Sequence, residues 1–357
     1  MIGRGIDQIL PHPDKPQLHE PYANDAREYL SLAEQLNGKI DYPVSMDYIW
    51  GDALAVWKQL KPDVKIINLE TAITKCDDFD PGKDIHYRCN PLHIDALRSA
   101  GINICTLANN HILDWNAEGL LETMLTLKNA GIKFSGAGEN CMQAMQPAII
   151  DLKTGKRVLV FAAGMASSGI PANWKAKPQR AGIYYLTSLG LETLISIQKN
   201  IKLHRGPNDL IVFSIHWGSN WGYDVSDSFQ TFAHSLIDTA NVDIIFGHSS
   251  HHPRPIEIYH DKPIFYGCGD FINDYEGIGG YEEFRGDLSL MYFIDLDPAS
   301  LKLVKMTLIP LQIKKFRLQH ASDNDCKWML QSLNQSSRFG MQLTFNDGQL
   351  VYTHQLG

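Results

Sequence analysis

Short apolar runs alternate with amphipathic patterns along the first 270 residues of the chain. The runs over 64–70, 102–108, 209–215 and 242–245 have the length and composition of buried strands. Apolar residues at helical spacing fill the intervals, over 50–60, 91–100, 119–130, 189–203 and 226–240. This order of strands and helices predicts an α/β fold whose sheet is covered on both faces.

The remaining segments carry other patterns. Residues 148–152 and 157–163 flank Thr154-Gly155 and are predicted to form a hairpin, and 288–296 alternates with 301–313 as an antiparallel pair. Residues 11–45 are predicted to form a surface excursion with one helix, and 165–180 to lack regular structure. Because the last residues hold only a helix and a weak hairpin, we expect a main domain over 1–319 and a C-terminal appendix over 320–357.

Side chains that can bind metals follow four of the predicted strands. They are Glu70 after the first run, Asn110 and His111 after the second, His216 after the third, and His248 and His251 after the fourth. Ligand sites of open α/β sheets lie at the carboxyl ends of strands, so we expect these side chains to share one crevice. A loop with three close histidines can also be simply solvated, and residues 248–252 alone do not decide between the two interpretations.

The donor types indicate the metal chemistry. Nitrogen and oxygen ligands without a thiolate suit a pair of Mn, Fe, Zn or Mg ions. Two such ions about 3.5 to 4 Å apart activate a water molecule and clamp both oxygens of a phosphoryl displacement. A carboxylate such as Glu70 is a natural bridge between them.

Composition narrows the class of protein. Hydrophobic residues make up 44% and charged residues 20%, which is typical of a folded globular protein. The net charge of -8 without a basic run gives no support to a nucleic-acid or anionic-membrane partner. None of the six cysteines lies in a C-x-x-C pair, so we expect reduced thiols and a cytoplasmic protein. The sequence contains neither a transmembrane run nor a signal-peptide pattern.

Five motifs together resemble one protein family. They are Asn68-Leu69-Glu70-Thr71, Ala108-Asn109-Asn110-His111 with Asp114, His216-Trp217-Gly218, Gly247-His248-x-x-His251 and Gly269-Asp270-Phe271. From residue 1 to about residue 275 the chain resembles the CapA/PgsA family of poly-γ-glutamate capsule proteins, a branch of the calcineurin-like metallophosphoesterases. The resemblance implies a four-layer α/β/β/α sandwich and a metal-dependent hydrolase acting on a phosphate ester.

The resemblance also implies a role for each site residue. Asn110, His216 and His248 resemble ligands of one metal, His251 resembles a ligand of the other, and Glu70 resembles the bridge. His111 resembles the acid that protonates the leaving oxygen, and Asp114 the residue that orients it. Asp114 has an alternative role as the N-cap of the following helix.

One departure from the family pattern affects the metal count. Family members open with a strand and Gly-Asp ahead of the segment that here reads Met1-Ile2-Gly3-Arg4. We therefore expect either a truncated start or a lost ligand, in which case the protein binds one ion or none. Asp7 is not assigned as a replacement. The choice of His251 over its neighbour His252 rests on spacing alone.

Substrate binding is predicted at residues that flank the motifs. The candidates are Arg4, Asn68, Arg88, Asp270 and Arg285. Arginine can hold a phosphate or carboxylate through two hydrogen bonds, although a lone arginine more often pairs with an acidic side chain. Asn68 has an alternative role in pinning the end of its strand. The substrate is expected to be a small molecule or a polymer.

Two further functions stay open at this point. The same activated water could cleave an amide, including a γ-glutamyl bond. A non-catalytic role in capsule or exopolymer assembly is the alternative from a different class.

Overall fold

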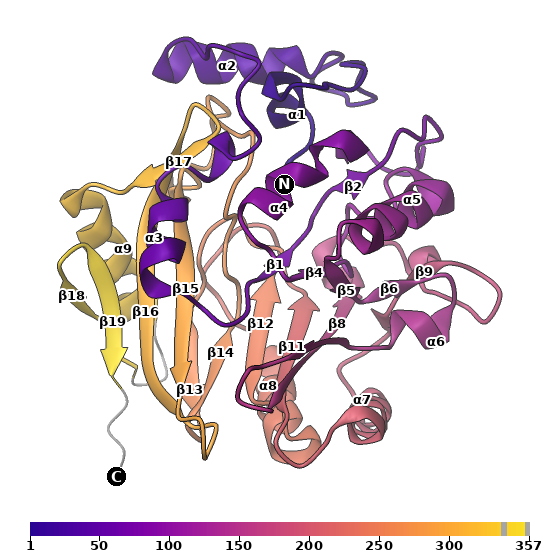
Figure 1. The fold of residues 1–357 in the computed structure, drawn as a ribbon, viewed down its shortest axis with the longest axis vertical. Coiled ribbons are helices and arrows are strands. Elements are labelled where there is room, and N and C mark those ends of the chain that lie inside the picture. Colours follow the sequence, from indigo (N-terminus) through magenta and orange to yellow (C-terminus); the bar gives the residue numbers. More distant parts are fainter. Residues whose placement is uncertain (337–340, 354–357) are drawn as a thin grey trace.

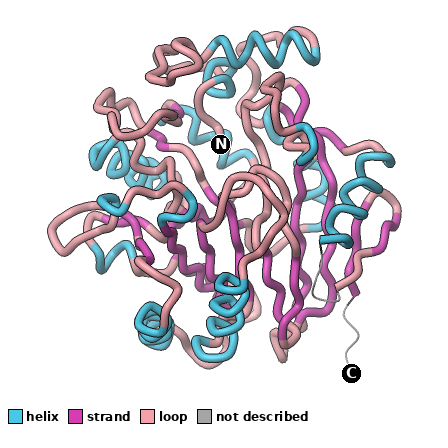
Figure 2. Tube along the Cα trace, turned by 180° about the vertical axis from the view of Figure 1, so that it is seen from behind, coloured by secondary structure: helices cyan, strands magenta, loops and turns pink. Residues whose placement is uncertain are grey.

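The computed structural model describes residues 1–336 and 341–353, and these form layers of strands between layers of helices (Figures 1 and 2). One layer is a mixed sheet in the order β10-β8-β11-β12-β14-β13, with β7 antiparallel to β8. Its strands are β7 (Ala148–Asp151), β8 (Arg157–Met165), β10 (Tyr185–Leu186), β11 (Leu210–His216), β12 (Ile244–His248), β13 (Ile256–Tyr259) and β14 (Lys262–Phe265).

The second layer contains two sheets. One is the parallel sheet β1-β4-β5, formed by β1 (Ile66–Asn68), β4 (Ile104–Thr106) and β5 (Lys133–Ser135). The other is antiparallel, β15-β16-β19-β18 with β17 on β16. Its strands are β15 (Leu288–Leu296), β16 (Leu303–Lys314), β17 (Arg317–His320), β18 (Thr344–Asn346) and β19 (Gln349–Thr353).

Helices cover the outer faces of both layers. Helices α7 (Leu191–His204) and α8 (Asp227–Ala240) lie against the large sheet, where Ile197 and Phe232 share a core with Phe213. Helices α4 (Ile94–Ser99) and α5 (Asn116–Asn129) cover β1-β4-β5, and α3 (Ala53–Leu60) lies over β15 and β16 (Figure 1). The expected α/β/β/α sandwich is therefore confirmed.

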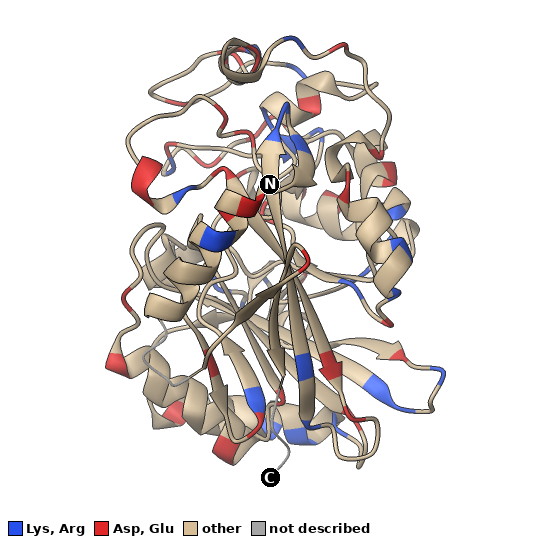
Figure 3. Ribbon diagram, turned by 90° about the vertical axis from the view of Figure 1, so that its left-hand side faces the viewer, with Lys and Arg blue, Asp and Glu red and all other residues tan. Residues whose placement is uncertain are grey.

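The shorter elements lie around these layers. Helices α1 (Gly5–Ile9) and α2 (Arg27–Asn37) lie together above the sheets, α6 (Cys141–Ala144) precedes the hairpin, and α9 (Asp323–Ser336) packs beside β16. The paired strands β2 (Ala72–Ile73) with β3 (Arg88–Cys89) and β6 (Ala137–Gly138) with β9 (Gly182–Ile183) are very short. Charged residues of both signs occur across the ribbon (Figure 3).

Alternation along β11 explains how the site is formed. Ile211, Phe213 and Ile215 point into the core under α7 and α8. The intervening residues point toward β4, as the 3.2 Å hydrogen bond from Ser214 Oγ to Thr106 Oγ1 shows. His216 continues this inward row, and the parallel register places it opposite His248 on β12. The two histidines therefore lie between the sheet layers.

Most predicted elements are confirmed, with four differences. The strands expected over 64–70 and 102–108 are the shorter β1 and β4, and the helix expected over 91–100 is split into the 3₁₀ turn η2 (Pro91–His93) and α4. The segment 165–180, expected to lack regular structure, contains the 3₁₀ turns η3 (Ala166–Ser168) and η4 (Ala172–Trp174). Two more 3₁₀ turns are η1 (Tyr48–Trp50) and η5 (Glu282–Phe284).

The C-terminal segment extends a sheet of the main body. Strand β19 pairs with β16 over Lys305–Leu308, and β18 pairs with β19. The limit between a main domain at residue 319 and an appendix stays a prediction. Within residues 1–336 and 341–353, none of the helices combines the length and apolar character needed to cross a membrane.

Candidate functional site

Glu70, Asn110 and His216 converge from three strand ends. His216 Nε2 lies 3.0 Å from Asn110 Oδ1 and 3.6 Å from Glu70 Oε1. Glu70 follows β1, Asn110 follows β4, and His216 is the last residue of β11. The sequence-based expectation that strand ends bring these residues together therefore agrees with the geometry.

The hydrogen-bond partners of His216 and His248 indicate which of their ring nitrogens carry a proton. The Ser214 hydroxyl donates to Thr106, so it accepts from His248 Nε2, 2.7 Å away. His248 Nδ1 is then the acceptor in its 2.6 Å contact with His216 Nδ1, which donates. This leaves a lone pair on His216 Nε2, facing the side-chain oxygens of Asn110 and Glu70. An imidazole nitrogen, an amide oxygen and a carboxylate oxygen are donor types that a divalent cation accepts.

Burial keeps both imidazoles neutral. It lowers the pKa of His248 to about 3. It also lowers the pKa of His216 well below its ordinary value, with a further contribution from the nearby His248. Neutral imidazole is the form that binds metals.

A second group of potential ligands, His251 and Asp270, interacts electrostatically with Glu70. Burial raises the pKa of Glu70 to about 7, and the neighbouring carboxylate of Asp270 adds to the effect. Asp270 Oδ2 accepts hydrogen bonds from His251 Nδ1 at 3.0 Å and from Asn273 Nδ2 at 2.8 Å. Burial alone would raise the pKa of Asp270, but contacts with His251 and Asn273 outweigh it and lower the pKa, so Asp270 stays ionised beside Glu70. A buried carboxyl group next to a second carboxylate is an environment that a cation would relieve.

The structure distinguishes the adjacent histidines of this loop. His251 contacts Asp270, whereas His252 accepts a hydrogen bond from Gly222 N at 3.1 Å and stacks on Phe284. Of the two, His251 therefore lies at the site.

The side chain of Asn68 forms hydrogen bonds with residues at the ends of β1 and β4. Its Nδ2 donates to Glu70 Oε2 at 2.7 Å, and its Oδ1 accepts from Asn109 Nδ2 at 3.0 Å. The pinning role that the sequence left open for Asn68 agrees with these contacts.

His111, Asp114 and Lys83 form a chain beside the potential ligands. His111 Nδ1 lies 2.7 Å from Asp114 Oδ2, and Lys83 Nζ lies 2.8 Å from Asp114 Oδ1. Lys83 also donates to the carbonyl of Asn110. Burial, followed by the charge of Lys83, lowers the pKa of His111 to about 4. Burial opposes ionisation of Asp114, but the charges of Lys83 and His111 prevail and lower its pKa.

Two further observations concern Asp114 and Lys83. Asp114 does not cap α5, whose N-cap residue is Trp115, and instead accepts from Tyr87 N at 2.7 Å. Lys83 was missed, because a single lysine in the polar segment between β2 and β3 follows no periodic or motif pattern.

The three candidate arginines are engaged in ion pairs. Arg4 binds Asp274 and Glu20, at 2.6 and 3.1 Å. Arg88 contacts Asp14 at 3.2 Å and Asp77 at 2.9 Å, and Arg285 contacts Asp287 and Asp325, both at 2.8 Å. Their assignment as substrate ligands stays a prediction.

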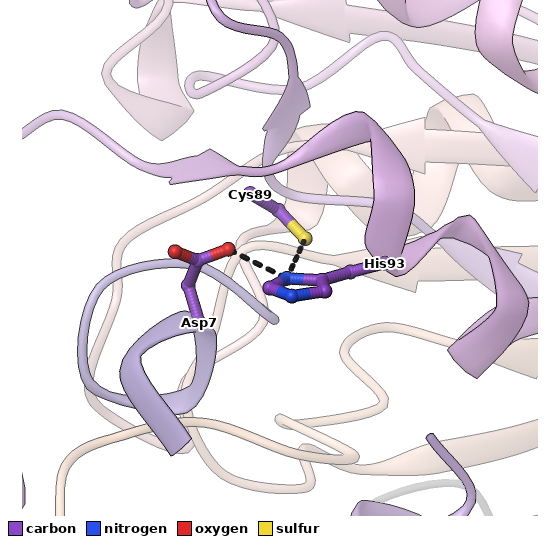
Figure 4. Close-up of side chains that lie close together, drawn as sticks. All are labelled: Asp7, Cys89 and His93. Carbon is purple, nitrogen blue, oxygen red and sulfur yellow. Dashed lines mark hydrogen bonds and ion pairs between the residues drawn. The ribbon is translucent and has the colours of Figure 1, made fainter. Parts of the chain in front are cut away.

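A separate buried cluster contains Asp7, Cys89 and His93 (Figure 4). His93 Nδ1 lies 2.7 Å from Asp7 Oδ1, and His93 Nε2 accepts from His12 N at 3.1 Å. The Asp7 oxygens also accept from Asn90 N at 2.8 Å and Asp14 N at 2.7 Å. Burial raises the pKa of Cys89 well above its ordinary value. With donors already supplied by the protein, this cluster fits a structural network better than a metal site.

Comparisons with known proteins place the chain among capsule-synthesis proteins. The model of the family "Bacterial capsule synthesis protein PGA_cap" matches residues 1–275. A probable polyglutamine synthesis accessory protein of Mycobacterium tuberculosis is 44% identical over 353 residues, covering 98% of this chain and 93% of the relative. The capsule biosynthesis protein CapA of Bacillus anthracis is 29% identical over 193 residues, covering 54% of this chain and 45% of the relative. The chain belongs to the PGA_cap family of bacterial capsule synthesis proteins.

Proposed function

We propose that the protein is a metal-dependent hydrolase of the metallophosphoesterase type, acting on a phosphate ester. The observation that supports this most is the convergence of Glu70, Asn110 and His216, with His216 Nε2 presenting a lone pair to two oxygens. Glu70, Asn110 and His216 would hold one ion. The ligand role of His248 stays a prediction, because its Nδ1 accepts the hydrogen bond from His216. Glu70 would bridge to a second position, which His251 and Asp270 would share. When bound, such ions lower the pKa of water and offset charge on phosphoryl oxygens.

His111 would move the proton to the leaving oxygen. Asp114 accepts from Nδ1, so Nε2 is the nitrogen that would face a substrate. A pKa of about 4 makes the ring neutral at pH 7. A phosphoryl anion beside the ring would stabilise the imidazolium form of His111 by Coulomb attraction. Substrate binding would therefore favour protonation of His111, which would then donate this proton to the leaving oxygen.

Metal binding is the first test, because it does not depend on the substrate. Calorimetric titration of the metal-stripped protein with Mn²⁺ is expected to give binding that Glu70→Gln and His216→Ala abolish. His260→Ala is the matched control, because the His260 side chain is 69% exposed and contacts Asp238 and Tyr259, neither of which belongs to the site. Equal Mn²⁺ affinity in all four proteins would refute the proposed site.

Catalysis is tested on a panel of phosphomonoesters and phosphodiesters. Turnover is expected to fall by at least two orders of magnitude in His111→Ala. Full activity in that variant would exclude His111 as the proton donor.

A role in polymer synthesis is the second candidate, and the names of the relatives favour it. They are called a polyglutamine synthesis accessory protein and PGA biosynthesis protein CapA. In this alternative the site cleaves an amide, including a γ-glutamyl bond, or binds polymer without cleaving it. Hydrolysis of a γ-linked glutamate oligomer without phosphatase turnover would favour the first form. Binding of the oligomer without any hydrolysis would favour the second. The cytoplasmic location stays a prediction.

A further inference from the structure

Two tyrosine side chains link the two halves of the candidate site. The ring of Tyr87 meets that of His111 edge to face, with 4.6 Å between the ring centres. The ring of Tyr275 meets that of His251 in the same way, at 5.1 Å. A hydrogen bond of 3.1 Å from Tyr87 Oη to Tyr275 Oη joins the two phenols. The pair therefore connects the proposed proton donor with the proposed second metal position.

Both tyrosines are held by contacts with residues of the site. The backbone N–H of Tyr87 donates to Asp114 Oδ2 at 2.7 Å. The backbone N–H of Tyr275 donates to Asn273 Oδ1 at 3.1 Å, and Asn273 Nδ2 donates in turn to Asp270 Oδ2 at 2.8 Å. Hydrogen-bond donors that are held in place before a substrate binds need little reorganisation during the reaction.

The protons of the two hydroxyl groups have different partners. Tyr87 is fully buried and its hydroxyl donates to Tyr275, so that proton is already engaged. Tyr275 is partly exposed, and its hydroxyl donates to the thioether sulfur of Met1 at 3.7 Å. A thioether is a weak acceptor, so an anionic oxygen in its place would form a stronger hydrogen bond. Of the two phenols, Tyr275 is thus the one that can donate to a ligand.

The neighbours of this hydroxyl indicate the class of ligand. The proposed hydrolase would hold a phosphoryl group between His111, which would protonate the leaving oxygen, and the metal positions beside Glu70 and His251. Tyr275 adjoins this space, because its ring contacts His251 and its hydroxyl contacts the phenol that packs on His111. A phenol has an ordinary pKa of about 10, so at pH 7 it is a neutral donor that suits a phosphoryl oxygen.

We propose that Tyr275 is a substrate-binding residue whose hydroxyl donates a hydrogen bond to a phosphoryl oxygen of the ester, and that Tyr87 positions it. This inference rests on the proposed function, because it takes a phosphoryl group as the ligand. The hydrogen bond from Tyr87 occupies one lone pair of the Tyr275 oxygen and so directs the Tyr275 proton away from Tyr87. When the ester binds, the phosphoryl oxygen replaces the sulfur of Met1 as the acceptor. Tyr87 acts through Tyr275 and does not touch the ester.

Binding of inorganic phosphate to the Mn²⁺-loaded protein tests this role separately from turnover. Calorimetric titration is expected to show at least tenfold weaker phosphate binding in Tyr275→Phe than in the unaltered chain, because one hydrogen bond to an anion is lost. The Mn²⁺ affinity of the variant should stay within twofold, which also shows that it is folded. Tyr259→Phe is the matched control, since the Tyr259 hydroxyl donates to Asp238 Oδ2 at 3.0 Å, outside the site.

The outcomes separate this inference from the proposed function. Equal phosphate affinity in Tyr275→Phe and the unaltered chain would overturn the role of Tyr275 and leave the proposed hydrolase standing. An unaltered chain that binds Mn²⁺ but no phosphate would overturn both.

A double-variant cycle tests the positioning role of Tyr87. Tyr87→Phe is expected to weaken phosphate binding about threefold, by removing the hydrogen bond that directs the Tyr275 proton. The variant that combines Tyr87→Phe with Tyr275→Phe should bind phosphate no more weakly than Tyr275→Phe alone, because the two changes act on one contact. Losses of phosphate affinity that simply add in the double variant would overturn the positioning role.

Discussion

Lys83 Nζ lies 2.8 Å from Asp114 Oδ1, and the opposite oxygen of the same carboxylate lies 2.7 Å from His111 Nδ1. Lys83 thereby fixes the group that orients the proposed proton donor. Only 11% of the Lys83 side chain and none of that of Asp114 is exposed, so solvent screens this pair very little. Replacing one partner of such a pair leaves an uncompensated buried charge.

We expect Lys83→Met to lower the free energy of unfolding by about 3 kcal/mol, because Asp114 is left buried without its cation. Urea unfolding measures the loss. The matched control is Lys15→Met, whose pair with Asp77 is 67% and 60% exposed and should contribute less than about 1 kcal/mol. Adding Asp114→Asn to Lys83→Met should recover part of the loss. A Lys83→Met variant as stable as the control would show that the pair contributes little.

Arg4 offers a test of structural against substrate-binding roles. Its guanidinium is held by Asp274 and Glu20 and lies 3.9 Å from the ring centre of Tyr29. Lysine keeps the charge but cannot reproduce the two-bond contact with Asp274. We expect Arg4→Lys to lower unfolding free energy by about 2 kcal/mol and to leave KM within twofold.

Steady-state kinetics on the substrate found by the ester panel separates these outcomes. A rise in KM of tenfold or more, without loss of stability, would instead support the sequence-based assignment of Arg4 to substrate binding. Arg27→Lys is the control, because Arg27 is 63% exposed and pairs with Asp25 on the surface.

The buried histidines predict a pH dependence for the metal-stripped protein. His248 has a pKa of about 3 in the folded state and about 6.5 when unfolded, so below pH 6.5 the unfolded chain binds more protons. The contribution of neutral His248 to the free energy of unfolding is therefore fully present above pH 6.5 and is lost as the pH falls toward 3. At pH 5.5 the loss from His248 is about 1 kcal/mol. His216, whose pKa is also lowered, acts in the same direction.

Urea midpoints at pH 7.5 and 5.5 measure this effect. His248→Gln should show a smaller difference between the two pH values than the unaltered chain, because its side chain does not titrate. Saturating Mn²⁺ should raise the midpoint at pH 7.5, since a ligand that binds only the folded state stabilises it. A pH dependence that is identical in His248→Gln and the unaltered chain would rule out His248 as a contributor.

Sequence patterns predicted the fold and the strand-end residues because these depend on local periodicity. Alternation along the apolar run of β11 determines which of its side chains point between the sheet layers, and parallel pairing places His216 opposite His248. The side-chain partners of these residues depend on how distant parts of the chain fold back on one another, and no local sequence pattern encodes this. Arg4 meets Asp274 across 270 positions, and Lys83 reaches Asp114 from an irregular loop.

A cavity between β1 and β15 illustrates the same limit. Its two strand edges come from segments more than 200 residues apart in the chain. Each run alone predicts a strand, but neither run indicates which of its edges lacks a neighbour. Only the assembled sheets reveal that, in the described part of the chain, these two end strands line one cavity.

The cysteines allow a prediction about the cluster of Asp7, Cys89 and His93. Within the described residues all six thiols are free, and only Cys141 is not buried. Because burial raises the pKa of Cys89, Cys105 and Cys268, their thiolate forms are suppressed. We expect a thiol reagent at pH 8 to label Cys141 at least tenfold faster than the others, as peptide mapping would show. Equal labelling of Cys89 and Cys141 would mean that the Asp7 cluster opens to solvent.

Metal content tests whether the cluster of Asp7, Cys89 and His93 holds an ion. We expect the same Mn²⁺ and Zn²⁺ content in Cys89→Ala as in the unaltered chain, since the Asp7 oxygens and the His93 nitrogens already have protein partners. A lower metal content in Cys89→Ala would show that the cluster binds a metal.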